Sequence, residues 1–95
     1  MITHVVLFKL NEPVSDNATE VSRRLLAMDG KVESLQSIRV GRDVGCDARA
    51  YDLCLMTTHA DTEALAAYQA DPIHMEVKAF IGTVAQSVAL VDFES

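Results

Sequence analysis

The stretch Ala67-Tyr68-Gln69-Ala70-Asp71-Pro72-Ile73-His74 contains the helix break around which this fold can be inferred. Asp71 and Pro72 end one predicted helix and begin the next, since Asp is a favoured N-cap and proline is tolerated at the first helical position. Tyr68 closes the first helix and His74 lies in the first turn of the second. A phenol and an imidazole, two groups that can exchange protons, are therefore expected near one bend.

Alternating and helical apolar spacing predicts the remaining elements. Ala18, Val21, Leu25 and Met28 form one stripe of a helix that Ser15 or Asn17 can cap. A similar inward stripe in the last helix is expected at Ile73, Val77, Phe80 and Val84. Strands are predicted over 2–10, 35–44, 51–59 and 85–93, and helices after 15–17, over 61–70 and over 72–84.

The order of these elements, β-α-β-β-α(α)-β, predicts an α+β, ferredoxin-like domain spanning 1–95, with an antiparallel sheet and helices on one face. The strands are apolar on both faces, so something should cover the second face. We expect a homodimer whose two sheets face each other and close into a barrel, with a cavity between them. His4, Val6, Phe8 and Tyr51 are candidates for lining that cavity.

Composition narrows the expected partners. The chain has 95 residues, an apolar fraction of 49%, a net charge of −6 and a pI near 4.8. Such acidity argues against nucleic acid or an anionic membrane as partner. No apolar run approaches the roughly 20 residues of a membrane span, and no secretory leader is recognisable. Cys46 and Cys54 have no disulfide or metal-type spacing; Cys54 is expected to be buried and Cys46 exposed, in a cytoplasmic protein.

Five motifs together resemble one known family. They are His4-Val5-Val6-Leu7-Phe8-Lys9, Gly41-Arg42-Asp43, Tyr51-Asp52-Leu53, the segment 68–74 and Val91-Asp92-Phe93-Glu94. In order and spacing the chain resembles the stress-responsive A/B barrel domain (Dabb) family, of the dimeric α+β barrel superfamily. The resemblance implies a ferredoxin-like protomer and a homodimer. One plant member is a polyketide cyclase whose catalytic tyrosine and histidine match Tyr68 and His74, and a further histidine of that enzyme matches His4.

Each candidate residue has a structural reading beside the catalytic one. His74 could remove a proton alpha to a carbonyl, or simply cap its helix. Tyr68 could polarise a carbonyl, or pack against Leu65 with its hydroxyl reaching solvent or a backbone carbonyl. His4 is either a satisfied core group or a cavity residue. His59, at a strand end, is expected to be solvent-exposed.

No cofactor or metal is expected, because the three histidines lack the spacing of a known metal site and no nucleotide-binding glycine loop is present. Three functions remain open. The chain could be a cofactor-independent enzyme, such as a cyclase or isomerase, acting on a small hydrophobic carbonyl compound. It could instead hold a small hydrophobic ligand without transforming it. It could also be a structural stress protein with a filled, inert barrel.

Overall fold

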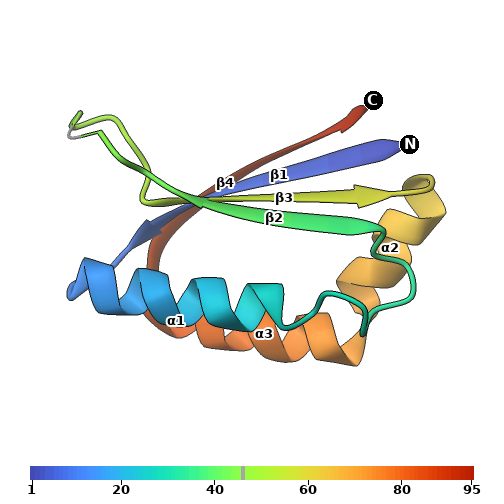
Figure 1. The fold of residues 1–95 in the computed structure, drawn as a ribbon, viewed down its shortest axis with the longest axis horizontal. Coiled ribbons are helices and arrows are strands. Elements are labelled where there is room, and N and C mark those ends of the chain that lie inside the picture. The colour runs from blue at the N-terminus through green and yellow to red at the C-terminus, as the bar shows by residue number, and fades with distance from the viewer. Residues whose placement is uncertain (46) are drawn as a thin grey trace.

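The computed structural model describes residues 1–45 and 47–95, and it confirms the predicted order of elements. One layer is an open sheet and the other is formed by helices, with α1 and α3 side by side beneath the sheet and α2 at one end (Figure 1). The elements are β1 (Ile2–Leu10), α1 (Val14–Leu26), β2 (Ser37–Arg42), β3 (Leu53–His59), α2 (Thr62–Ala70), α3 (Pro72–Val84) and β4 (Ala85–Glu94). Cys46, which the sequence predicted to be exposed, lies outside the described residues.

The sheet has the strand order β2-β3-β1-β4, and every neighbouring pair is antiparallel. β1 is therefore central, between β3 and β4. In this register Val5 faces Met56 on one side and Val91 on the other, while His4 faces Thr57 and Asp92. Because successive side chains of a strand point to opposite faces, these two rows lie on opposite faces of the sheet.

The core lies between the sheet and the helices. Val6, Phe8 and Leu10 of β1 point toward the helix layer and are buried. The predicted α1 stripe is confirmed, since its four residues are at most 1% exposed. α1 and α3 also meet through Arg24, whose guanidinium carbon lies 3.7 Å from the centre of the Phe80 ring.

The helix break around Asp71 forms as the sequence predicted. Asp61 caps α2 by accepting a hydrogen bond from the Ala64 amide, and Asp71 caps α3 by accepting one from the Ile73 amide. Pro72 occupies the first position of α3, where its missing N–H removes no helical hydrogen bond. The two caps fix where Tyr68 ends one helix and His74 enters the next.

Some local expectations were wrong. Helix α1 begins at Val14, earlier than predicted, and its N-cap Pro13 provides no side-chain cap. Asn17 does not cap the helix; its side-chain Nδ2 donates to the Asn11 carbonyl instead. The two middle strands are shorter than predicted: β2 by two residues at each end, and β3 by two residues at its start. In α3 the buried position is Ile81, which the predicted stripe omitted. Val77, Phe80 and Val84 of that stripe are partly buried and pack against the core, while Ile73 is 39% exposed.

The sheet face turned away from the helices is uncovered. Met56, Val91 and Phe93 on that face are 40%, 55% and 46% exposed, and Val5 and Leu7 are only half-buried. Cys54, expected to be buried, is half-buried on this same face, opposite Leu7. A row of apolar side chains thus lies open across three strands.

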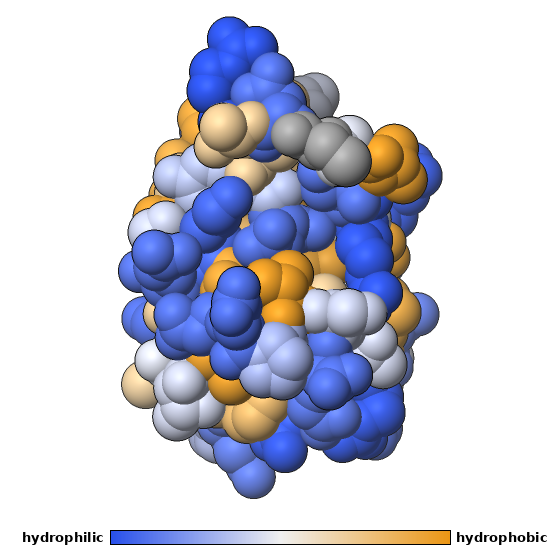
Figure 2. All heavy atoms as spheres, turned by 90° about the vertical axis from the view of Figure 1, so that its left-hand side faces the viewer, coloured by the Kyte–Doolittle hydropathy of each residue, from blue (hydrophilic) through white to orange (hydrophobic). Residues whose placement is uncertain are grey.

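The end of the molecule at which α1 begins has a different character. Figure 2 shows mainly hydrophilic side chains there, with a small apolar area between them. Among the helices of the described residues, none is both long and apolar enough to cross a bilayer.

Candidate functional site

Four aromatic side chains from four elements meet beneath one end of the sheet. Tyr68 of α2 lies at the centre, with ring centroids 4.4 Å from His74, 4.7 Å from His59 and 6.1 Å from His4. The strands supply His4 and His59, and the break between α2 and α3 supplies the other two. The predicted juxtaposition of Tyr68 and His74 is therefore present, and two more histidines join it.

His74 lies on the wall of a pocket with its proton positions fixed by the backbone. Its Nδ1 lies 3.2 Å from the Gln69 carbonyl oxygen. A carbonyl only accepts, so Nδ1 carries the proton and Nε2 keeps a free lone pair in the neutral ring. Burial lowers the pKa of His74, and the charge of Lys78 acts in the same direction. His74 is thus held as a neutral base near neutral pH.

Tyr68 is fully buried, and its hydroxyl has no hydrogen-bond partner among the described residues. The sequence predicted that a purely structural Tyr68 would extend its hydroxyl to solvent or to a backbone carbonyl. Among the described residues the hydroxyl contacts neither. Burial raises the pKa of Tyr68 to about 12. The phenol therefore stays protonated at neutral pH and retains an unused donor, which is a costly arrangement in a protein interior.

His4 is buried and paired with Asp92, which lies directly opposite on β4. Its Nδ1 contacts the Asp92 carboxylate, so the structure combines both readings of this residue: a satisfied core group that also borders the pocket. Asp92 itself is about one-third exposed, at the edge strand. The pair links the tyrosine cluster to the free edge of the sheet.

His59 is completely buried, which overturns the expectation that it is solvent-exposed. Its Nδ1 donates to the Ser34 carbonyl at 2.8 Å, and its Nε2 accepts from the Thr57 hydroxyl at 2.8 Å. Burial lowers the pKa of His59, which favours this neutral form. The chain segment before β2 covers the end of β3, and the sequence around His59 carries no local sign of that cover.

An apolar pocket of about 470 Å³ opens beside His74, between the sheet and α3. Its polar lining comes from His4, Gln69, His74 and Lys78. The remaining lining is apolar or glycine and comes from Phe8, Leu25, Leu55, Val77, Ile81, Gly82, Ala85, Val88 and Leu90. A volume of this size is in the range of small-molecule sites.

This pocket is separate from the cavity that the sequence predicted between two facing sheets. The pocket lies on the helix side of a single sheet, because His4 and Phe8 point toward the helices. Of the four proposed lining residues, these two border it. Val6 is instead packed in the core, and Tyr51 borders a separate hollow near Arg42 and Cys54.

Comparison with known proteins places the chain in a family. Residues 2–95 match the Stress responsive A/B Barrel Domain, Dabb. The chain belongs to the Dabb family. No curated protein sequence matches it. The family resemblance inferred from the five motifs is thereby confirmed.

Solved structures share the fold of this Dabb domain. A dimeric ferredoxin-like protein of unknown function from Thermobifida fusca is 26% identical, with a TM-score of 0.87, over 99% of this chain and 90% of that one. An Arabidopsis thaliana protein is 22% identical, with a TM-score of 0.87, over 100% and 95%. A hydroxynitrile lyase from Passiflora edulis is 9% identical, with a TM-score of 0.84, over 97% and 90%. The family model and these neighbours agree on a ferredoxin-like A/B barrel fold.

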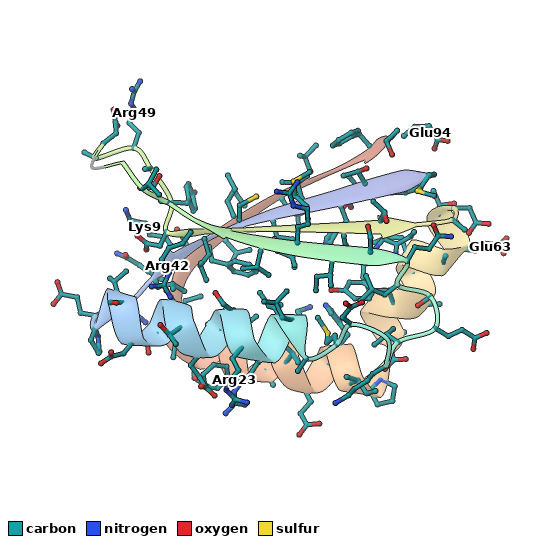
Figure 3. The ribbon with its side chains drawn as sticks, viewed as in Figure 1. Lys9, Arg23, Arg42, Arg49, Glu63 and Glu94 are labelled. Atoms are coloured by element: carbon teal, nitrogen blue, oxygen red, sulfur yellow. The ribbon has the colours of Figure 1, made fainter. Side chains whose placement is uncertain are left out.

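Charged groups of the Dabb domain lie mostly away from the cluster. In Figure 3, Arg23 points away from the helix layer, and Arg49, Glu63 and Glu94 lie at the ends of the molecule. Within the described part of the chain, no group of three or more His, Cys, Asp or Glu side chains could hold a metal ion.

Sequence reasoning missed Lys78 and Gln69 as pocket residues. A signal for Lys78 existed, because side chains four positions apart on a helix lie side by side, and Lys78 follows His74 by four. For Gln69 the signal was weaker, since its contribution to His74 is a backbone carbonyl that any residue could supply.

Proposed function

We propose that this Dabb domain binds a small hydrophobic carbonyl compound in the pocket beside α3 and catalyses proton transfer on it without a cofactor. The observation that carries the proposal is the neutral His74 ring on the wall of an apolar pocket, with its Nδ1 engaged by Gln69. Its Nε2 lone pair is then the basic atom available to a bound molecule.

In the proposed step, His74 Nε2 takes a proton from the carbon alpha to the carbonyl. The electron pair of that C–H bond moves to form an enolate, and His74 becomes an imidazolium. The enolate is then reprotonated at a different carbon, giving an isomer, or attacks a second carbonyl of the same molecule, closing a ring. His74 gives the proton back in either case, so no oxidant or further reactant is consumed.

Tyr68 is the proposed hydrogen-bond donor to the enolate oxygen. Its phenol stays protonated, its hydroxyl has no partner, and its ring contacts His74. A donor aimed at developing negative charge is an effective catalytic device. Because the hydroxyl is closed off in this structure, the neighbouring rings must move when a ligand binds.

Proton exchange provides a direct test. Benzylacetone, a simple apolar ketone, is incubated with the protein in D2O, and loss of its alpha protons is followed by NMR. We expect the wild type to accelerate exchange and His74→Ala to lose about 100-fold or more of that acceleration. Glu76→Gln, a change on the same helix outside the pocket lining, is the matched control and should exchange like the wild type.

Two results would overturn the catalytic proposal: no acceleration by the wild type, or the same acceleration in His74→Ala. A second function, ligand binding without catalysis, is favoured by the closed position of the Tyr68 hydroxyl. In that case benzylacetone would raise the melting temperature equally in the wild type and in His74→Ala, with no exchange in either.

We further propose that two copies pair through the uncovered sheet face. The row Met56, Val5 and Val91 supports this proposal, because such apolar exposure is typical of an interface. The Thermobifida fusca relative with this fold is a dimer. Pairing on that face would leave the pocket on the helix side accessible in each protomer.

A further inference from the structure

The pocket holds one permanently charged side chain, Lys78, and it is a cation. Lys78 follows His74 by four residues on α3, so both side chains project from the same side of the helix. Both line the pocket, and the charge of Lys78 reaches His74, where it disfavours the protonated ring. The cation is therefore close enough to the His74 ring to influence its charge.

The pocket lining contains no carboxylate, although the protein as a whole is acidic. The chain has 14 Asp and Glu residues against 8 Lys and Arg, yet none of the residues bordering the pocket is Asp or Glu. Because acidic residues outnumber basic ones in this chain, a random selection of its residues would contain more acidic than basic side chains. The local charge at this pocket is thus opposite to the net charge of the chain.

Two acidic groups that adjoin the aromatic cluster, Asp92 and Asp71, already have partners. Asp92 is engaged by His4, and Asp71 accepts the Ile73 amide as the N-cap of α3. Lys78 forms no ion pair within the described residues. Its side chain is exposed to solvent, so its ammonium group is available to a molecule bound in this largely apolar pocket.

We infer that Lys78 is a specificity-determining residue, and that the pocket selects an apolar molecule carrying a carboxylate whose negative charge lies against Lys78. This inference deepens the proposed function and rests on its pocket. The apolar walls from Phe8, Leu55 and Ile81 would take the hydrocarbon part. Lys78 would hold the carboxylate beside His74, which places the neighbouring carbon chain near the proposed base.

A matched pair of ligands tests the inference. Phenylbutanoate and its neutral amide, phenylbutanamide, have nearly the same shape and differ in charge. Binding of each is measured by titration calorimetry above about pH 7, where the acid is ionised and histidine is largely neutral. We expect the wild type to bind the acid about fivefold more tightly than the amide, the upper range for an ion pair open to solvent.

Lys78→Met keeps the length and apolar stem of the side chain and removes its charge. We expect this variant to bind acid and amide equally, with the affinity for the amide unchanged. Lys31→Met removes an exposed lysine outside the pocket and should keep the wild-type preference. Added salt should weaken acid binding by the wild type and leave amide binding unaffected.

The inference is wrong if the wild type shows no preference for the acid, if neither ligand binds, or if Lys78→Met keeps the preference in full. These measurements involve no turnover, so they are independent of the proton-exchange assay. A lost acid preference with intact exchange would remove the role of Lys78 alone. A preference that persists in His74→Ala, without exchange in the wild type, would retain Lys78 and remove the catalytic proposal.

Discussion

The Tyr68 and His74 rings lie with their centroids 4.4 Å apart and their planes inclined by 49°. Burial acts on the two in opposite directions, raising the pKa of the phenol and lowering that of the imidazole. Both groups are consequently neutral near pH 7, one as a donor and the other as an acceptor. This separation of an acid and a base by environment is what general acid–base chemistry requires.

Replacing Tyr68 by Phe separates its chemical role from its structural one. The hydroxyl has no hydrogen-bond partner among residues 1–45 and 47–95, so Tyr68→Phe should leave the free energy of unfolding unchanged or raise it by up to about 1–2 kcal/mol. Under the proposed function, proton exchange should fall by about 100-fold. Urea unfolding and the benzylacetone assay measure the two effects. A clear loss of stability would show that the hydroxyl has a partner in solution.

Removing His59 should weaken the fold much more than removing His74. His59→Ala leaves the Thr57 hydroxyl and the Ser34 carbonyl without their partner and opens a buried cavity. We expect the free energy of unfolding to fall by about 2–4 kcal/mol. His74→Ala, at a half-buried position, should cost less than about 1 kcal/mol. Equal losses in urea unfolding would contradict the burial difference between the two histidines.

Stability should depend on pH through these same histidines. The native pKa values of His59 and His74 lie below the ordinary value of 6.5, so the unfolded chain binds more protons as pH falls past 6.5. The free energy of unfolding should therefore be higher above pH 6.5 and decline as pH falls toward the native pKa values. Urea unfolding at several pH values measures this dependence.

His74→Gln provides the comparison for the pH effect. It removes one of the two titrating groups, so the decline in stability below pH 6.5 should be shallower than in the wild type. Lys31→Met, which changes no histidine, should follow the wild-type curve. An unchanged or steeper decline in His74→Gln would show that His74 is not the source of the effect.

The proposed dimer makes a prediction about the two faces of β4. Val91 lies on the uncovered face and Leu90 on the helix side, and they are 55% and 61% exposed. Val91→Glu should produce monomers, because the dimer interface would then bury one unpaired carboxylate from each protomer. Leu90→Glu, the matched control, should stay dimeric. Light scattering after size-exclusion chromatography gives the masses; a monomeric wild type, or a dimeric Val91→Glu, would contradict the proposal.

Local patterns were sufficient where a residue's neighbours along the chain decide its environment. The apolar stripe of Ala18, Val21, Leu25 and Met28 is buried as predicted. Asp61 and Asp71 are the N-caps of α2 and α3, also as predicted. Capping depends on hydrogen bonds that span two or three residues, and a helical stripe depends on a fixed period. Such features can be inferred without knowing the tertiary contacts.

Sequence patterns gave wrong predictions where a segment distant along the chain determines whether a residue is buried. His59 was expected in solvent, yet Ser34 covers it from 25 positions earlier in the chain. The pocket beside His74 lies between one sheet and α3, whereas the sequence directed attention to the other face of the sheet. Alternation indicates that residues share a face, but it does not say which of two faces the helices cover. The sequence correctly placed His4 and Phe8 on the same face of β1, but that face turns toward the helices and not toward a second sheet.

By itself the sequence determined the order of elements, the helix break at Asp71-Pro72 and the closeness of Tyr68 to His74, because each depends on short-range backbone geometry. The tertiary structure alone decided that the Tyr68 hydroxyl is sealed, that His59 is buried and that Lys78 borders the pocket. Those features set protonation and charge at the candidate site. They arise from desolvation by side chains that only the folded chain brings together.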